Sequence, residues 1–335
     1  MTETTQQQQA CLLFLHAQTG MHPGSGTALG TVDLPIQRER HTQWPIIPGS
    51  TLKGILRDTV RENVKGNYKP EYEEQNENGE RKSVLKRSQR RVTNEDDADL
   101  VAAFGPGKVD QQNGHVGAIS LTDARVLAFP VRSLKGVFAW VTCPAVLGRL
   151  ARDLKLGPNL NGQAPPEFKL QPLPAKDKGL CKKDGPLVID NNKLLLEEFE
   201  FEVTGEATDV AKWIADHAVS DAFTQDRIKS HLVVLHDDDF THFVRHATEV
   251  VARVGLDYER KTVKKKALFY EEFLPPETLF YSVVLASPSR RQGHGKSAAE
   301  MLEYLRKNLP RVLQIGGDET IGKGLCAVQL DGGAK

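Results

Sequence analysis

Short strand patterns alternate with amphipathic helix patterns in both halves of the chain, and this alternation is the feature that most constrains the fold. In the first half, an apolar strand pattern at 11–19 precedes a helix pattern at 51–64, in which apolar residues recur three and four positions apart. In the second half, a strand pattern at 278–286 precedes a helix pattern at 296–308. Strand–helix–strand units of this kind predict an α+β chain with two similar folded parts.

Charge and cysteine content narrow the possible classes of protein. The 44 basic side chains balance the 44 acidic ones, so the protein is not expected to coat a nucleic acid through its bulk charge. Any site for a polyanion must therefore be a local patch. No apolar run approaches the roughly 18 residues needed to cross a bilayer, so no membrane partner is expected. The four cysteines lie far apart without a C-x-x-C pair, which argues against a zinc knuckle or disulfide framework and predicts a cytoplasmic protein.

Two regions lack strand or helix periodicity. Residues 1–9 are polar and predict a disordered tail. Residues 66–114 carry an acidic stretch, a basic stretch and a second acidic stretch, which predicts a polar inserted region and favours a solvated loop over a binding face. The folded core then comprises 10–65 and 115–335.

The middle of the core is predicted from periodicity and turn signals. Pro144 favours the first turn of a helix, and the run from Asp237 to Asp239 favours a helix N-terminus. The Asp190-Asn191-Asn192 run favours a turn between paired strands. The predicted strands lie at 119–127, 136–142, 187–189, 194–203 and 231–236, and the predicted helices lie at 144–155, 207–218 and 239–252.

Two segments near the C-terminus combine strands with special turns. Strand patterns at 254–258 and 267–272 flank a basic turn, which predicts a hairpin. Short strands at 312–315 and 325–330 flank a glycine-rich turn, where glycines allow close backbone approach and an anion-binding concavity; a plain structural turn is the alternative. The basic turn carries Arg260, Lys261, Lys264, Lys265 and Lys266.

Two glycine motifs resemble nucleotide-binding loops but lack essential parts. Gly317, Gly322 and Lys323 match most of the phosphate-loop pattern, but Gly324 replaces the hydroxyl that binds magnesium, and no helix can follow. The glycines after the first strand lack the third glycine of the dinucleotide fingerprint, because Leu29 stands there. We therefore expect no nucleotide cofactor.

Three histidines near an aspartate run raise the possibility of a metal site. His242 and His246 are four residues apart on a predicted helix, near His236, and this spacing suits one metal ion. No glutamate follows His242, as a zinc-protease motif requires. We favour surface histidines beside a capping cluster, with a metalloenzyme as the alternative.

The turn before the first predicted helix suits a phosphate. Pro48 and Gly49 lead into Ser50, which is a good N-cap. The helix N-terminus presents unpaired N–H groups and the positive end of the dipole, and Lys53 adds a charge in the first turn. Arg57, one turn further on, extends the contact.

One part of the sequence carries a specific family resemblance. It runs HPGSGT at 22–27, LGTVDLPIQRERHT at 29–42 and PIIPGSTLKG at 45–54, and the segments at 255–272 and 316–324 agree with it. The chain resembles the RAMP proteins of CRISPR effector complexes, in particular the backbone subunits of type III-B (Cmr) complexes.

The resemblance implies a fold and a set of partners. The fold would be a ferredoxin-like or RRM-like palm with inserted fingers, a thumb β-hairpin at 253–272, and a C-terminal glycine-rich loop with flanking strands at 313–330. Such subunits polymerise head to tail along a CRISPR guide RNA and meet complementary target RNA and other Cmr subunits. Their thumbs wedge into the guide–target duplex at regular intervals.

The resemblance also implies catalytic residues. Asp33 matches the aspartate associated with cleavage of target RNA. Its carboxylate would assist deprotonation of an RNA 2′-hydroxyl, directly or by positioning a divalent ion such as Mg²⁺ or Mn²⁺, and a loop-capping role is the structural alternative. His22, in the same loop, is a candidate to orient the phosphate or protonate the leaving oxygen, and Glu271 and Tyr270 at the thumb base are weaker candidates.

The RNA-binding candidates lie in four places: the turn into the first helix, the loop after Asp33, the thumb tip and the glycine-rich turn. Arg38 and Arg40 either hold the loop or contact RNA. The full set is Ser50, Lys53, Arg57, Arg38, Arg40, Arg260, Lys261, Lys264, Gly316, Gly317, Gly322, Lys323 and Gly324.

The sequence therefore predicts a guide-RNA-binding backbone subunit that is also a metal-dependent endoribonuclease. One alternative is a purely structural subunit that coats guide RNA while another component cuts. A second alternative is a RAMP-type nuclease that processes CRISPR transcripts as a monomer. An aspartate in the TVDLP loop favours a subunit that cleaves target RNA over a purely structural one. The long insertions favour a subunit that polymerises over a monomeric processing nuclease.

Overall fold

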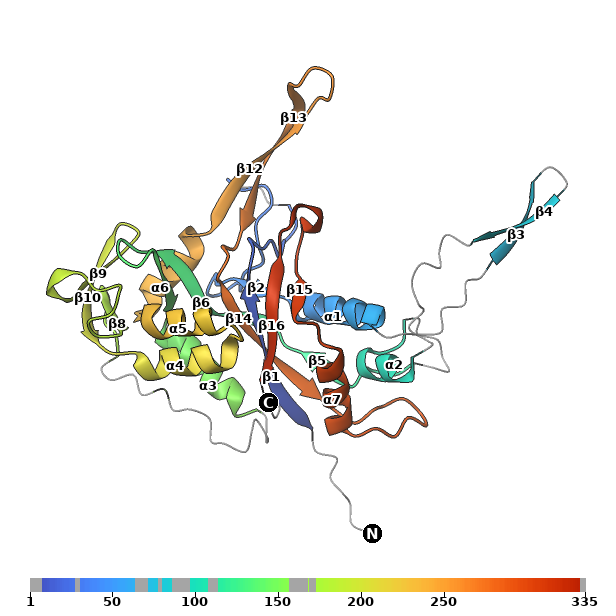
Figure 1. Ribbon diagram of the computed structural model, residues 1–335, viewed down its shortest axis with the longest axis horizontal. Helices are drawn as coiled ribbons and strands as arrows, with labels where there is room; N and C mark the ends of the chain where they lie inside the picture. The colour runs from blue at the N-terminus through green and yellow to red at the C-terminus, as the bar shows by residue number, and fades with distance from the viewer. Residues whose placement is uncertain are drawn as a thin grey trace, which may run out of the picture. The chain divides into compact units, whose positions relative to one another are not determined.

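The computed structural model describes residues 8–27, 31–63, 72–77, 80–85, 97–107, 114–156, 168 and 173–331 (Figure 1). The chain divides into two compact units. No helix in these described ranges is long and apolar enough to cross a membrane. The larger unit contains Ala10–Leu52, Leu121–Val284 and Arg311–Lys335, and the smaller unit contains Met1–Gln9, Lys53–Ser120 and Leu285–Pro310.

A large mixed sheet forms the core of the larger unit. Its strands are β1 (Gln9–Ala17), β2 (Ile46–Ile47), β5 (Ile119–Leu121), β6 (Ala124–Arg132), β7 (Phe138–Thr142), β8 (Lys178–Cys181), β9 (Lys193–Leu196), β10 (Phe199–Gly205), β11 (Leu232–Leu235), β14 (Leu279–Ala286), β15 (Val312–Gln314) and β16 (Leu325–Asp331). The order is β15-β16-β1-β14-β6-β7-β11-β8-β10-β9, with β2 beside β6 and β5 beside β14. The β7–β11 and β8–β10 pairs are parallel. The antiparallel pairs are β15–β16, β16–β1, β14–β6, β2–β6, β6–β7, β11–β8 and β10–β9. All residues of β1 after Gln9 are buried, as expected for a strand covered on both faces.

Four helices of the larger unit gather at the β7–β10 end of this sheet (Figure 1). They are α3 (Pro144–Leu154), α4 (Thr208–Ala218), α5 (Ala222–His231) and α6 (Asp237–His246). Pro144 occupies the first turn of α3, as predicted. His236, not the aspartate run, is the N-cap of α6. Asp237 instead caps α3, because its Oδ1 accepts a hydrogen bond from the Ala145 N–H at 2.9 Å.

A separate two-stranded hairpin extends beyond the large sheet of this unit (Figure 1). Strand β12 (Glu249–Leu256) pairs antiparallel with β13 (Val263–Phe273), so the predicted hairpin is confirmed and is longer than expected. Val254 faces Leu268 and Ala252 faces Tyr270 across the pair, and the register shifts between Val254 and Leu256. Valine-rich strands of this kind favour a pleated sheet.

The smaller unit is mostly helical. It contains most of α1 (Gly49–Asn63), together with α2 (Ala98–Phe104), α7 (Ala298–Asn308) and the hairpin β3 (Tyr72–Glu77) and β4 (Glu80–Leu85). Ser297 caps α7 through a reciprocal capping box with Glu300. Asp97 caps α2, a helix that lies in the region expected to be a polar insertion.

The predicted helix at 239–252 was wrong in its second half. Helix α6 ends at His246, and strand β12 begins at Glu249. The segment from Glu249 to Leu256 contains three valines, which favour a strand, and pairing with β13 supplies the hydrogen bonds that a lone segment lacks.

The predicted strand at 194–203 was also wrong, because it is a tight hairpin of β9 and β10. Glu197 lies in the turn with a left-handed φ of 49°, which no turn-forming glycine or asparagine signals. Residues 187–189 form no strand and make only a single bridge, from Ile189 to Lys193. Helix α5 was not predicted, because its apolar periodicity is weak and only Ile228 is buried.

Candidate active site at the hairpin base

The loop that carries Asp33 is hydrogen-bonded to the base of the β12–β13 hairpin. The backbone N–H groups of Asp33 and Leu34 donate to the Tyr270 carbonyl at 3.1 and 3.0 Å, and the Glu272 N–H donates to the Leu34 carbonyl at 3.0 Å. The Tyr270 N–H donates to Asp33 Oδ2 at 2.8 Å. The carboxylate is therefore fixed to β13 by one oxygen, while the residue as a whole is exposed to solvent.

Glu271 lies at the centre of a buried charged cluster. Its Oε2 accepts a hydrogen bond from Arg253 Nε at 3.1 Å, and Arg253 Nη2 also pairs with Asp318 of the glycine-rich turn. Burial raises the pKa of Glu271, and the neighbouring Asp318 carboxylate raises it further. Glu271 therefore holds a proton to higher pH than an ordinary glutamate.

His22 is buried beside Glu271 with a defined tautomer. Its Nδ1 lies 2.7 Å from the Glu272 carbonyl, which can only accept, so Nδ1 carries the proton. The Nε2 atom faces Glu271 Oε1 at 3.7 Å. Gly24 keeps space for the ring, because a Cβ there would lie 2.7 Å from Nε2. The structure thus brings His22 and Glu271 together and attaches the Asp33 loop to the same strand.

The glycine-rich turn supports the His22 backbone. The Gly317 N–H donates to the His22 carbonyl at 3.0 Å. Gly316 has a φ of 92°, and a Cβ there would lie 2.2 Å from the same carbonyl oxygen, so no other residue fits. The Lys323 ammonium lies 4.8 Å from the centre of the Phe273 ring, as a cation–π contact. The turn therefore positions the histidine loop, which the sequence motif alone did not indicate.

In the described structure, the Arg38 side chain makes hydrogen bonds within the protein. Its Nη2 donates to Glu272 Oε1 at 2.5 Å, and its Nη1 donates to the Gln43 and Val244 carbonyls, both at 2.8 Å. The other oxygen of Glu272 accepts from the Ile36 N–H at 3.1 Å. Arg38 and Glu272 together clamp the loop onto α6 and β13. Arg40, two residues on, is exposed.

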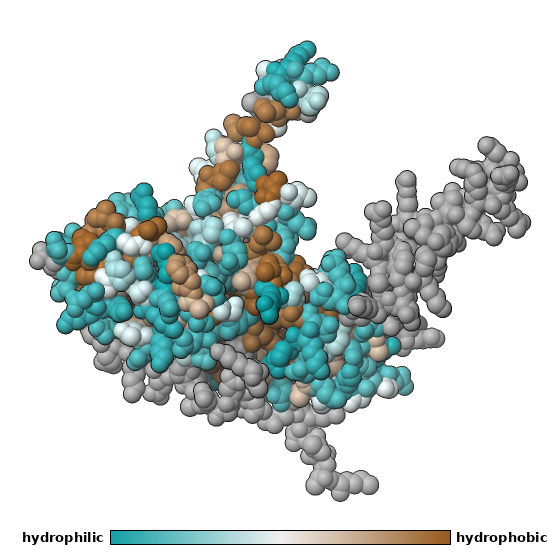
Figure 2. Space-filling view, in the orientation of Figure 1, coloured by the Kyte–Doolittle hydropathy of each residue, from teal (hydrophilic) through white to brown (hydrophobic). Residues whose placement is uncertain are grey.

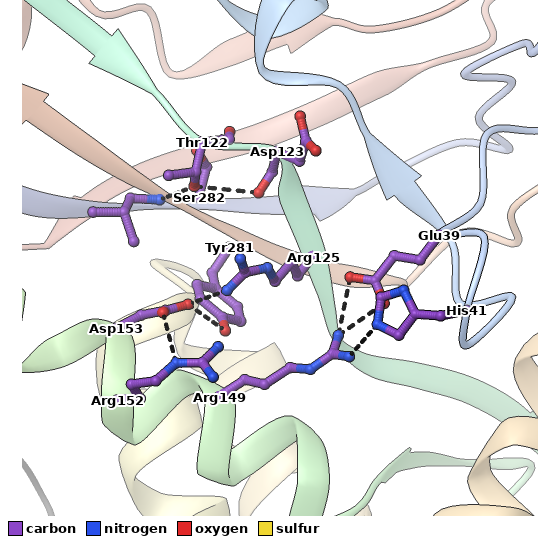
Figure 3. A network of polar contacts seen from close by, with 11 residues as sticks. Glu39, His41, Thr122, Asp123, Arg125, Arg149, Arg152, Asp153, Tyr281 and Ser282 are labelled. Carbon is purple, nitrogen blue, oxygen red and sulfur yellow. Dashed lines mark hydrogen bonds and ion pairs between the residues drawn. The ribbon is translucent and has the colours of Figure 1, made fainter.

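A second clamp holds the far end of the same loop (Figure 3). Arg149 of α3 donates to both carboxylate oxygens of Glu39, at 3.0 and 2.9 Å, and its guanidinium lies over the Trp44 ring. Burial alone would raise the pKa of Glu39, but hydrogen bonds from Thr42 and Arg149 outweigh it and lower the pKa. Glu39 is thus a fixed anion that keeps the loop in place.

Sequence reasoning missed four residues of this site: Arg253, Glu272, Asp318 and Arg149. The sequence signal for one of them, Glu272, was the pair of acids Glu271 and Glu272 after the apolar run from Ala267 to Tyr270, since adjacent strand residues point to opposite faces. Arg253 and Asp318 gave no local signal, because 65 residues separate them.

A basic face on α1 contains the predicted phosphate-binding residues. Burial lowers the pKa of Lys53, and the Arg57 charge lowers it further. Arg57 Nη2 donates to the Gly105 carbonyl at 3.0 Å, and burial and Arg61 lower its pKa. Ser50 is not the N-cap, because α1 begins at Gly49, whose N–H donates to Asp123 at 2.8 Å.

The outer half of the β12–β13 hairpin is apolar along its length and polar at its tip (Figure 2). Val254, Leu256 and Leu268 are each about half exposed, at 51 to 53%. At the tip, Arg260 is exposed and Lys261 Nζ lies 4.7 Å from the centre of the Tyr258 ring. The Lys264 side chain lies outside the described part of the structure, as do residues 28–30 of the Asp33 loop.

The described residues contain no group of three or more histidine, cysteine, aspartate or glutamate side chains that could hold a metal ion. The histidine metalloenzyme alternative therefore has no support in this part of the chain. Mg²⁺ in nucleic-acid enzymes is commonly held by one or two carboxylates, with waters and substrate phosphates completing its ligands. The exposed Asp33 carboxylate fits an ion held in that way, jointly with RNA.

The fold and these motifs define a known family, and the chain belongs to the RAMP superfamily, whose sequence pattern matches residues 14–327. The resemblance stated from the motifs is thereby confirmed. The chain is 37% identical over 325 residues to the CRISPR system Cmr endoribonuclease Cmr4 of Pyrococcus furiosus, with 96% of each chain covered.

Solved structures agree in fold. Oligomeric Cmr4 from Pyrococcus furiosus superposes with a TM-score of 0.66 and 29% identity, over 97% of this chain and 99% of that one. A chain of the type III-B Cmr-beta complex bound to cognate target RNA also gives a TM-score of 0.66, at 20% identity and 96% coverage of both chains. At that identity the second likeness concerns the fold alone.

Proposed function

We propose that this chain is the guide-RNA-binding backbone subunit of a type III-B (Cmr) CRISPR effector complex, and that it cleaves complementary target RNA with Asp33 as the catalytic residue. The observation that carries the proposal is the attachment of the Asp33 carboxylate to the base of the hairpin by the Tyr270 N–H. Full-length similarity to an endoribonuclease of this class supports the activity.

The chemistry is a transfer within the RNA strand. Asp33 takes the proton of a 2′-hydroxyl, and the 2′ oxygen bonds to the adjacent phosphorus as the bond from phosphorus to the 5′ oxygen breaks. The 5′ oxygen takes up a proton, so the products end in a 2′,3′-cyclic phosphate and a 5′-hydroxyl. Holding the three atoms in line supplies a large part of the rate.

His22 and Glu271 form the proton source for the leaving oxygen. The raised pKa of Glu271 keeps that carboxyl protonated to higher pH, and His22 Nε2 faces it at 3.7 Å. Tyr270 contributes its backbone to Asp33, and its side chain, 42% exposed, is accessible for contact with the scissile strand.

A divalent ion, Mg²⁺ or Mn²⁺, would be held weakly by Asp33 together with the RNA. When bound, it would supply charge neutralisation at the phosphate. Chelation by EDTA is expected to stop the cuts and leave binding of target RNA unchanged, as measured by gel shift and cleavage in the same samples. Cleavage at an unchanged rate in EDTA would show that Asp33 acts without a metal.

Guide RNA is held through its backbone by the basic face of α1, from Lys53 and Arg57. Arg40, Arg260, Lys261 and Lys264 add phosphate contacts, and the glycine-rich turn, with Gly322 and Lys323, lies along the same RNA. Lys53→Ala is expected to weaken the binding of all guide RNAs alike, whatever their sequence, since phosphates carry no sequence information. A loss that depends on guide sequence would contradict this role.

The assembly follows from the same proposal. A ferredoxin-like palm with inserted fingers stacks head to tail with copies of itself along the guide, and the filament meets other Cmr subunits at its ends. The apolar shaft of the hairpin, formed by Val254 and Leu268, wedges between stacked bases and places one target phosphate beside Asp33.

The test is cleavage of labelled target RNA by the complex reconstituted with wild-type subunit or with Asp33→Ala, with target binding measured in parallel. Loss of regularly spaced cuts with binding retained supports the nuclease. If the cuts persist at the same rate, the chain is a scaffold. The role of Asp33 would then be to cap its loop, through the hydrogen bond that it accepts from the Tyr270 N–H. Cutting of CRISPR transcripts by the isolated monomer would instead indicate a processing enzyme.

A further inference from the structure

A hollow in the larger unit lies between the β9–β10 turn and the last turn of α6. Its volume is about 300 Å³, at the lower end of the range of small-molecule sites, roughly 300 to 1,000 Å³. None of the ring side chains that line it takes part in the site formed by Asp33, His22 and Glu271. Its walls are Glu197, Glu198, Phe199, His242, Phe243, His246, Ala247 and Thr248.

Three rings form one wall of this hollow. The Phe199 and His242 ring centres are 4.9 Å apart, and those of His242 and His246 are 4.8 Å apart. Phe199 is 37% exposed although it is a large apolar residue, and both histidines are exposed. Burial lowers the pKa of His246, and the charges of His242 and Arg245 lower it further. Exposed aromatic and histidine rings are surfaces on which nucleobases stack.

The β9–β10 turn contributes two carboxylates to the lining of the hollow. Glu197 pairs with Arg132 at 2.8 Å, and Glu198 beside it is exposed. Unpaired negative charge at the mouth disfavours a phosphate and favours an N–H donor. Among RNA bases, adenine, cytosine and guanine present amino groups that a carboxylate can accept from. Uracil has only its N3–H, which lies between two carbonyl oxygens that repel a carboxylate.

The hollow is connected to the Asp33 loop by hydrogen bonds. Thr248 Oγ1 donates to Glu272 Oε1 at 2.8 Å, and Arg38 Nη1 donates to the Val244 carbonyl of α6 at 2.8 Å. Residues in and beside the hollow are thus hydrogen-bonded to Glu272 and Arg38, the pair that holds the Asp33 loop. Strand β12 begins at Glu249, immediately after the lining residue Thr248.

We infer that this hollow receives one unpaired nucleobase of the bound RNA, with Glu198 selecting bases that carry an amino group. The base stacks on the face of Phe199, and the His242 ring, inclined at 72° to that of Phe199, lies beside the base. The inference rests on the proposed function, because RNA bound along the hairpin is the source of the base.

The test measures binding of the full-length chain to oligoadenylate, oligocytidylate and oligouridylate of equal length, at several salt concentrations. The variants are Phe199→Ala, His242→Ala, His242→Phe and Glu198→Gln. Phe223→Ala is the matched control, because Phe223 is another exposed phenylalanine, 71% exposed on α5, outside the hollow. Loss of one stacked base corresponds to a fall in affinity of about fivefold or more.

The expected pattern separates stacking from charge. Phe199→Ala and His242→Ala weaken the adenylate and cytidylate strands about fivefold or more, with an unchanged salt slope because no phosphate contact is lost. His242→Phe retains affinity because the ring remains. Glu198→Gln removes the preference over oligouridylate, and Phe223→Ala changes nothing.

Other outcomes overturn the inference. Wild-type affinities in Phe199→Ala and His242→Ala show that no base enters the hollow, while RNA binding that depends on Lys53 leaves the proposed function intact. If the wild-type chain binds no RNA, both fall together. If adenosine monophosphate alone binds tightly and depends on Phe199 and His242, the occupant is a free nucleotide rather than the RNA strand.

Discussion

The base and the outer half of the β12–β13 hairpin belong to the same two strands but carry different kinds of side chain. At the base, charged side chains are buried and paired: Glu272 with Arg38, and Glu271 with Arg253. In the outer half, apolar side chains such as Val254 and Leu268 face each other across the pair and are half exposed. The base therefore fixes the geometry of Asp33, and the outer half offers an exposed apolar surface, to which the proposed function assigns RNA.

This difference predicts that substitutions at the base reduce stability and cleavage together, whereas substitutions in the outer half reduce cleavage alone. The largest stability effect is expected for Arg38→Ala. It leaves the Glu272 carboxylate buried without its charge partner, and breaking a buried pair in this way costs about 3–5 kcal/mol. Denaturant unfolding measures it. Arg40→Ala, at an exposed neighbour, is the control and should change stability by less than about 0.5 kcal/mol.

Gly316→Ala is expected to come next. Its Cβ would meet the His22 carbonyl oxygen at 2.2 Å, and its φ of 92° is already unfavourable for alanine. Gly322 has a similar φ of 76° but open space around it, so Gly322→Ala carries only the backbone term of about 1–2 kcal/mol. Unfolding free energies that fall equally in both variants would show that the His22 loop moves freely.

Much of this architecture was predictable and some was not. The hairpin, β1, α3 and α7 follow from local periodicity. Asp33 was named only through the family resemblance of its loop, and its role stays a prediction. The clamp from Arg38 to Glu272 joins residues 234 positions apart, so no local pattern reports it. The helix predicted through 252 failed because pairing between β12 and β13 outweighs helix propensity, which is a weak preference when tertiary contacts oppose it.

The clamp at Glu39 gives a smaller effect that depends on pH. The folded pKa of Glu39 lies below its unfolded value, so its stabilising contribution is present above the unfolded pKa and is lost as pH falls through the folded pKa. Glu39→Gln should therefore lower the melting temperature at neutral pH and converge with wild type in acid. The exposed Glu62→Gln is the control, and a gap that persists at low pH would contradict the Glu39–Arg149 pairing.

The smallest stability change is expected in the outer half. Leu268→Ala removes an exposed side chain and should shift the free energy of unfolding by less than about 0.5 kcal/mol. Cleavage of target RNA by the reconstituted complex should nevertheless fall, because the wedge between bases is shortened. Normal cleavage together with a large loss of stability would mean that this half belongs to the folded core.

The most direct measurement of the central claim is target cleavage by the complex containing Asp33→Asn. Asparagine keeps an oxygen that can accept from the Tyr270 N–H, so the loop stays attached to the hairpin base while the negative charge is lost. The account predicts normal binding of target RNA and a cleavage rate reduced by about 100-fold or more, as for loss of a general base. Cleavage at the wild-type rate would show that Asp33 only caps the loop, and would contradict a catalytic role.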